Sequence, residues 1–279
     1  MQYLPGSTIE IVKPDIPRGT VKHALFDFDG TLSLIREGWQ KVMVGMMVDI
    51  LMQTPEHESR EELTRIVRDF VDRLTGKQTI YQMLQLAEEV RTRGLEPRDP
   101  LDYKHQYLDL LWEQIKHRVQ GLRAGTIAPS EMLVPGSLEM LRGLRERGVT
   151  CYLASGTDIP YVRDESDALG LHPYFGEHIY GALDNWKTFS KAMLIQRIIQ
   201  QHQLQGAQLL TFGDGYVEIE NTVEVGGIAI GVATDERHPG VVDAWKRERL
   251  IQAGAALIMP DFRQTPALLA YLFPEATSL

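Results

Sequence analysis

The feature that most constrains the fold is an alternation of short apolar segments and amphipathic segments in the two outer parts of the chain. Apolar runs of strand length occupy residues 21–27, 149–154, 208–212, 228–232 and 256–259. Segments with helical spacing or helical composition lie at residues 137–147, 190–202 and 241–253. Strands that alternate with helices form βαβ units, and nearly continuous apolar strands are typical of a parallel sheet covered on both faces. We therefore predict an α/β fold built on a parallel sheet.

The middle of the chain has a different pattern. Between residues 38 and 123 the apolar residues recur at helical spacing, and no convincing strand is present. This segment separates the first predicted strand from the second. We predict an all-helical insertion at residues 35–130, and a core domain made of residues 1–34 and 131–279.

Composition excludes several classes of protein. Cys151 is the one cysteine, so an internal disulfide or a cysteine-rich metal cluster is ruled out. No apolar run approaches the roughly 18 residues that span a membrane, and residues 1–17 lack the basic start and apolar block of a signal peptide. We expect a cytoplasmic protein without a membrane partner. The net charge of −9 disfavours nucleic acid as a partner, and the oligomeric state stays open.

Polar residues follow three of the predicted strands at the point where each strand ends. Asp27 and Asp29 follow the first strand, Ser155 follows the second, and Asp214 and Glu218 follow the third. Ligands of parallel sheets bind at the carboxyl ends of the strands, where these residues are expected to meet. A cluster of carboxylates requires a cation, and oxygen ligands suit Mg²⁺. The sequence therefore predicts a magnesium site at this edge of the sheet.

These strand-end residues resemble the motifs of one enzyme superfamily. The run Asp27-Phe28-Asp29-Gly30-Thr31-Leu32 resembles the first motif of the haloacid dehalogenase superfamily, whose phosphatases use an aspartate nucleophile. Ser155 resembles the second motif, and Gly213-Asp214 with Glu218 resembles the acidic fourth motif. This resemblance implies a Rossmann-like core. The helical insertion is similar to the C1 cap of phosphoglycolate phosphatase-like members.

The third motif of the superfamily is a lysine near the start of the following helix. Lys187 and Lys191 both lie at a suitable distance from Asp214. We favour Lys191, because the preceding Ser190 is a good helix cap and places this lysine on the first turn.

The resemblance also implies a role for each motif residue. Asp27 is the expected nucleophile, and Asp29 is the expected general acid and base. The expected ligands of Mg²⁺ are Asp27, the backbone carbonyl of Asp29, Asp214 and Glu218. The expected phosphate-binding residues are Ser155, Gly156 and the motif lysine. The implied reaction is hydrolysis of a phosphate monoester through an aspartyl-phosphate.

Recognition of the substrate is expected from residues at the edge of the helical insertion. Arg36 comes shortly after the first motif, and Lys77 and Gln78 lie in a polar turn between two predicted helices. A cap that closes over the site favours a small organic phosphate, by analogy a sugar phosphate or a phosphoglycolate-like compound. Two alternatives stay open: a phosphomutase with the same motifs, and a catalytically silent metabolite-binding protein.

Overall fold

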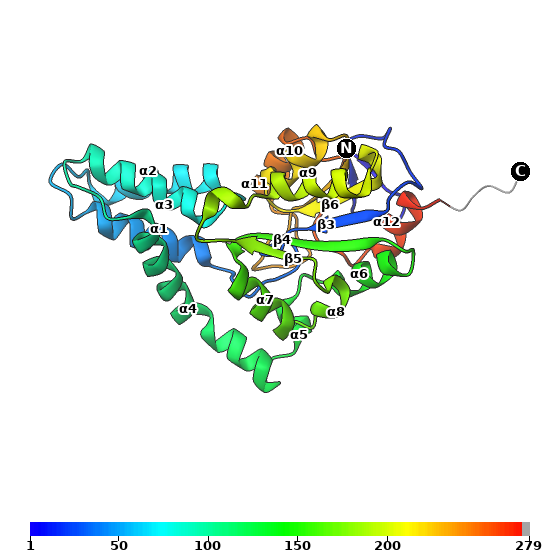
Figure 1. Cartoon of the computed structure of the whole chain (residues 1–279), viewed down its shortest axis with the longest axis horizontal. Helices are drawn as coiled ribbons and strands as arrows, with labels where there is room; N and C mark the ends of the chain where they lie inside the picture. Colours follow the sequence, from blue (N-terminus) through cyan, green and yellow to red (C-terminus); the bar gives the residue numbers. More distant parts are fainter. Residues whose placement is uncertain (275–279) are drawn as a thin grey trace, which may run out of the picture.

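The centre of the molecule is an eight-stranded sheet, shown in the computed structural model of Figure 1, which describes residues 1–274. The strands lie in the order β1-β2-β8-β7-β6-β3-β4-β5. Their bounds are β1 Gln2–Tyr3, β2 Glu10–Ile11, β3 His23–Phe26, β4 Thr150–Asp158, β5 Ile179–Ala182, β6 Leu209–Gly213, β7 Ile228–Val232 and β8 Leu257–Met259. The strands from β8 to β5 pair in parallel, and β1 and β2 add an antiparallel edge beside β8. The predicted α/β fold is confirmed.

The sheet extends beyond the sequence expectation in two places. The short strands β1, β2 and β5 carry no apolar run long enough to be read as strands, and they lie at the two edges of the sheet. Strand β4 continues past Ser155 to Asp158, where the expectation had ended it at residue 154. The pairing of Asp158 with Ala182 of β5, after an irregularity in the register, supports this extension.

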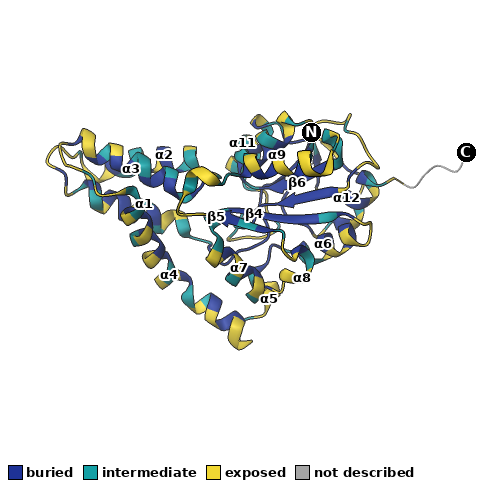
Figure 2. Cartoon of the chain, viewed as in Figure 1, coloured by how far each residue is buried: buried dark blue, intermediate teal, exposed yellow. Residues whose placement is uncertain are grey.

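Helices cover both faces of the sheet (Figure 1). One face carries α9 Lys191–His202, α10 Tyr216–Glu224 and α11 Ala244–Gln252. The other face carries α6 Ser137–Arg145, α7 Ile159–Ala168, α8 His172–Phe175 and α12 Thr265–Leu272. Short helices occur at α5 Pro129–Met132, η1 Trp186–Thr188 and η2 Gly206–Gln208. The parallel strands from β8 to β5 are largely buried and the outer helix faces are exposed, as Figure 2 shows, whereas both residues of the edge strand β1 are exposed.

A group of four helices lies between β3 and β4 in the chain and beside the sheet in space (Figure 1). These helices, called the cap below, are α1 Trp39–Leu51, α2 Arg60–Leu74, α3 Thr79–Thr92 and α4 Pro100–Ala124. Their apolar stripes pack together, with Met43, Val67, Leu86 and Leu111 almost fully buried. The expected all-helical insertion is confirmed. No helix within residues 1–274 combines the length and apolar character needed to cross a membrane.

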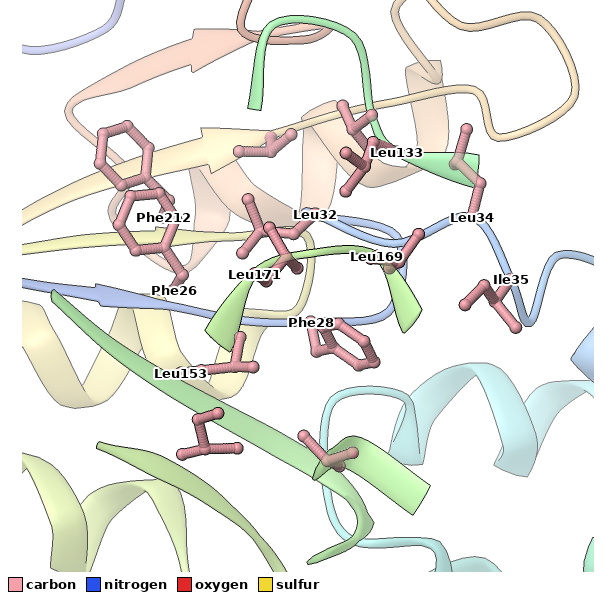
Figure 3. Packing of buried hydrophobic residues seen from close by; sticks show 14 of the residues in the cluster. Phe26, Phe28, Leu32, Leu34, Ile35, Leu133, Leu153, Leu169, Leu171 and Phe212 are labelled. Atoms are coloured by element: carbon pink, nitrogen blue, oxygen red, sulfur yellow. The ribbon is translucent and has the colours of Figure 1, made fainter. Parts of the chain in front are cut away.

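The two chain segments that join the cap to the sheet run side by side. Ser33 of the outgoing segment and Leu133 of the returning segment form an antiparallel bridge. The Leu34 amide donates to the Met132 carbonyl at 2.8 Å, and the Val134 amide donates to the Leu32 carbonyl at 2.9 Å. Figure 3 shows Leu32 and Leu133 in the same apolar cluster as Phe28. The junction is therefore a packed, hydrogen-bonded pair of segments.

Polar contacts join α4 and the end of α2, which lie away from the paired segments, to the core. The Lys104 ammonium of α4 is buried 2.7 Å from a carboxylate oxygen of Asp158, at the end of β4. Arg249 of α11 donates to the Asp72 carbonyl and, at 2.9 Å, to the Arg73 carbonyl in the last turn of α2. A cation at a helix C-terminus is favourable because the carbonyl groups there carry partial negative charge.

Candidate active site

Asp27 lies directly after the central strand β3 and is buried, with an exposed fraction of 7%. Its amide donates to the Phe212 carbonyl at 2.9 Å, which continues the hydrogen-bond ladder between β3 and β6. One carboxylate oxygen accepts the Phe28 amide at 2.8 Å, and the other lies 2.8 Å from the Lys191 ammonium. The backbone and one lysine thus fix the orientation of this carboxylate.

Asp29 lies two residues further along, beside the end of β4. Its Oδ2 accepts a hydrogen bond from the Thr157 hydroxyl at 2.9 Å, and the Ser155 hydroxyl lies 3.4 Å away. Its Oδ1 is buried without a hydrogen-bond partner, and Arg36 Nε lies 3.8 Å from it. The sequence motif assigned a role to Ser155 but none to Thr157, which belongs to the same polar run and makes the shorter contact.

Asp214 and Glu218 complete an acidic cluster after β6. Gly30, at a φ of +76°, leaves room for Asp214, because a Cβ atom at Gly30 would lie 2.3 Å from Asp214 Oδ2. Glu218 is fully buried on the first turn of α10, where it accepts the Gly215 amide at 2.8 Å and lies 2.9 Å from the Lys191 ammonium. Asp27, Asp214 and Glu218 each offer an oxygen atom within 4.8 Å of the others.

The two candidate motif lysines lie in different surroundings. Lys191 is the first residue of α9, whose cap Ser190 accepts the Met193 amide, and its ammonium lies between Asp27 and Glu218. Lys187 lies in the short helix η1, with its ammonium 5.3 Å from the centre of the Trp186 ring. The structure therefore brings Lys191, rather than Lys187, to the acidic cluster.

The acidic cluster holds more negative charge than the lysine balances. Burial raises the pKa of Asp27 well above its usual range, and the charges of Glu218 and Asp214 raise it further, against the opposing effect of Lys191. Burial also raises the pKa of Asp29 to about 7, with Arg36 opposing the shift and Glu165 and Asp27 adding to it. A divalent cation bound to the carboxylates would favour their ionised forms.

The donor set fits a hard divalent cation. Three residues, Asp27, Asp214 and Glu218, each offer a carboxylate oxygen, and such cations prefer oxygen ligands. The backbone carbonyl of Asp29 lies in the same loop as Asp27. The fit therefore rests on the chemistry of the donors and on the unbalanced charge around Asp27.

A second lysine contacts this cluster, and the sequence reading missed it. Lys246 of α11 lies 2.8 Å from Asp214 Oδ2 and 2.8 Å from Glu236 Oε1. Glu236 follows β7, so the rule that ligands gather at strand ends contained a signal for it. No motif marks Lys246, because it lies within a charged helix.

A cavity of about 90 Å³ lies between the acidic cluster and the cap. Its core wall includes Asp27, Asp29, Ser155, Lys191 and Asp214. Its cap wall consists of side chains from α1, α3, α4 and the turn before α3: Trp39, Met43, Thr75, Lys77, Thr79, Gln82 and Tyr107. The cap therefore covers the acidic cluster and limits the size of any ligand.

The three residues expected to contact substrate have different environments. Arg36 lines the cavity, but Glu165 of α7 holds its guanidinium through contacts of 2.6 to 3.1 Å. Lys77 lines the cavity with an exposed side chain. Gln78 donates to the Phe189 carbonyl at 2.6 Å and to the Trp186 carbonyl, so its amide joins the cap to the core.

Gly156 brings the core against the cap turn. A Cβ atom at this position would lie 2.8 Å from the Lys77 carbonyl oxygen and 3.3 Å from the carbonyl carbon. The absence of a side chain therefore allows the backbone after Ser155 to approach the cap closely.

Comparisons with known proteins agree with this architecture. A predicted phosphoglycolate phosphatase from Haemophilus somnus 129PT superimposes with a TM-score of 0.58 at 15% identity, over 89% of this chain and 98% of that one. CbbY from Rhodobacter sphaeroides, in complex with phosphate, gives a TM-score of 0.54 at 16% identity over 87% and 95% of the two chains. A HAD family hydrolase from Deinococcus radiodurans R1, with bound phosphate and sodium, gives 0.53 at 19% over 91% and 97%.

At these identities the structural likeness shows the fold alone. The chain has no significant match among curated proteins. The family model of the haloacid dehalogenase-like hydrolases matches residues 21–220, which include β3, the whole cap and the acidic cluster. The chain therefore belongs to the haloacid dehalogenase-like hydrolases.

Proposed function

We propose that the chain is a Mg²⁺-dependent phosphatase that hydrolyses a small organic phosphate monoester through an aspartyl-phosphate intermediate. The observation that carries the proposal is the position of Asp27 on the core wall of the cavity. Its carboxylate is oriented by the Phe28 amide and by Lys191, and it lies beside the acidic cluster. An oriented carboxylate next to a cation site is suited to nucleophilic attack on phosphorus.

The reaction assigns a role to each core residue. An oxygen of Asp27 bonds to phosphorus as the bond between phosphorus and the oxygen of the leaving alcohol breaks. Asp29 gives its proton to the oxygen of the leaving alcohol. Asp29 then takes a proton from a water molecule, whose oxygen attacks phosphorus and displaces Asp27, which releases inorganic phosphate. A pKa of about 7 suits Asp29 to both transfers near neutral pH. Lys191, Ser155 and the backbone at Gly156 bind the phosphoryl oxygens.

The proposed ligands of Mg²⁺ are Asp27, the backbone carbonyl of Asp29, Asp214 and Glu218. When bound, the cation offsets the charge of the carboxylates and polarises a phosphoryl oxygen. Glu218 contacts Lys191 directly, so we assign it an indirect role through water. Its carboxylate also fixes the start of α10 through the Gly215 amide.

We assign residues 1–34 and 131–279 to a core domain, and residues 35–130 to a cap domain that contains the four cap helices. The cavity that the cap covers has a volume of about 90 Å³. This volume supports a phosphate attached to a small organic group and disfavours a protein or nucleic-acid substrate. The absence of an internal disulfide is compatible with a cytoplasmic location.

Release of inorganic phosphate from p-nitrophenyl phosphate, with and without Mg²⁺, tests the proposal. We expect turnover that requires the metal and that falls by roughly 10³-fold or more in Asp27→Asn. Asp235→Asn is the matched control, because Asp235 also follows a strand but does not line the cavity. Full activity of Asp27→Asn would contradict the nucleophile assignment.

Release of inorganic phosphate from sugar phosphates, compared with the formation of isomers, separates the alternatives. A phosphomutase would convert a sugar phosphate into an isomer with little release of phosphate. A silent binding protein would bind phosphate esters without turnover. Either result would reject the phosphatase proposal.

A further inference from the structure

The cap wall of the cavity holds polar side chains that the protein leaves without partners. Gln82 of α3 and Tyr107 of α4 are each buried to an exposed fraction of 4%, and both line the cavity. Neither side chain hydrogen-bonds to another residue within the described part of the chain, and neither has a polar atom fully shielded from solvent. Their polar atoms stay accessible at the cavity, where water or a ligand can form the hydrogen bonds that the protein does not supply.

The same wall offers no free buried cation. Arg36 is the buried arginine of the cavity, and Glu165 holds its guanidinium through Nε and Nη2. The only other cation on the cap side of the cavity, within residues 1–274, is the exposed Lys77. A second anionic group on the substrate would meet Arg36, whose charge Glu165 and Asp29 offset, and the exposed Lys77, whose attraction water screens. The wall therefore gives such a group little net stabilisation for the water that it loses.

The remaining part of the wall is apolar. Trp39 and Met43 of α1 line the cavity next to the polar groups. A wall that combines an aromatic ring with unpaired hydrogen-bonding groups suits a ligand with carbon-bound hydrogens and hydroxyl groups.

We propose that Gln82 and Tyr107 select a phosphate ester whose leaving group is uncharged and carries hydroxyl groups, such as a polyol or sugar. Esters with a second anionic group, such as phosphoglycolate, are disfavoured. Gln82 and Tyr107 hydrogen-bond to a substrate hydroxyl, and Trp39 covers the carbon chain. The inference rests on the proposed phosphatase activity and narrows its substrate class.

Three substrates with small leaving groups test this selection. Glycerol 1-phosphate has two free hydroxyl groups, propyl phosphate has the same carbon skeleton without them, and phosphoglycolate carries a carboxylate instead. We expect kcat/KM for glycerol 1-phosphate to exceed that for each of the other two by about tenfold or more, because a site built around hydrogen bonds rejects analogues that lack the partner.

Variants of the cap wall connect the selection to the named residues. Tyr107→Phe and Gln82→Leu are each expected to lower the ratio of kcat/KM for glycerol 1-phosphate over propyl phosphate by about fivefold to tenfold. Tyr103→Phe is the matched control on the same helix. Its hydroxyl accepts the Arg98 amide and does not line the cavity, so the ratio stays unchanged. If Tyr107→Phe does not fold, as judged by circular dichroism, Gln82→Leu carries the test.

A binding measurement separates ground-state recognition from turnover. Isothermal titration of Asp27→Asn with each substrate is expected to give the lowest Kd for glycerol 1-phosphate. A preference for phosphoglycolate, or a ratio that moves in neither variant, overturns the selection while turnover of p-nitrophenyl phosphate keeps the phosphatase proposal. Absence of turnover on every ester, p-nitrophenyl phosphate included, overturns both.

Discussion

The buried ion pair between Lys104 and Asp158 allows the docking of the cap to be tested quantitatively. The Lys104 side chain is 2% exposed, and its ammonium lies 2.7 Å from Asp158 and 3.6 Å from Asp184. Lys104→Met keeps the length of the apolar stem and removes the charge. Loss of one partner from a buried pair costs about 3–5 kcal/mol of stability, because the other charge stays buried. Asp158 keeps 14% exposure and Asp184 keeps 76%, so we expect the lower end, about 3 kcal/mol.

Urea denaturation followed by circular dichroism measures this loss. Lys116→Met is the control, because it makes the same change on the same helix at an exposed pair. Lys116 is 41% exposed and lies 2.5 Å from Glu113, so its variant is expected to cost less than about 1 kcal/mol. The double variant Lys104→Met/Asp158→Asn should recover part of the lost free energy of unfolding, because it no longer leaves an unpaired carboxylate at Asp158. Equal costs for Lys104→Met and Lys116→Met would refute the reasoning.

Three further predictions follow from other contacts. Gly156→Ala places a Cβ atom against the Lys77 carbonyl and should lower kcat/KM by about 10- to 100-fold in the phosphate-release assay. The control is Gly45→Ala on α1, where a Cβ atom meets no other atom within 4 Å, and it should leave kcat/KM unchanged. Burial and two neighbouring histidines lower the pKa of His23 to about 4. Between pH 6.5 and 4 the unfolded chain binds a proton that the folded chain does not, so the free energy of unfolding should fall by at most about 1 kcal/mol per pH unit as the pH is lowered. Urea titrations at several pH values should show a smaller slope for His23→Gln. Lys191→Met removes the cation beside the nucleophile and should lower kcat by about 10²- to 10³-fold without raising KM to match; a change in KM alone would contradict its placement.

Much of the fold was predictable because its strongest signals are local. The central strands are continuous apolar runs, and the cap helices carry long apolar stripes. The sequence pattern does not predict β5, because its four residues contain Gly181 and the strand is stabilised by its pairing with β4. The sequence alone lacked any signal for the two-residue strands β1 and β2, whose partners lie at the other end of the chain.

The candidate site was predictable to the extent that its residues end strands. Asp27, Asp29 and Asp214 follow strands, Ser155 lies in the last part of β4, and the topology brings the four together. The partner of Arg36 was not predictable, because Glu165 lies 129 positions away and no motif joins the two.

The sequence did not identify the residues of the cap wall as part of the site, for a different reason. Tyr107 fits the apolar stripe of α4, and the sequence pattern indicates a core position for it. The ring is buried as that pattern predicts, yet it also borders the cavity. Periodicity reports which side of a helix faces inward, but not whether that side meets packed side chains or a cavity.

The paired segments at Ser33 and Leu133 have a mechanical consequence. A lid on one strand can twist, slide and swing, whereas two strands joined by hydrogen bonds on both sides of a bridge behave as one stiff ribbon. Twisting or sliding would break the Leu34 and Val134 hydrogen bonds, while bending across the ribbon preserves them. A hinge motion of the cap at this junction would therefore bend across the ribbon, and such a motion would keep Gln82 and Tyr107 in register with Asp27 on the opposite wall of the cavity.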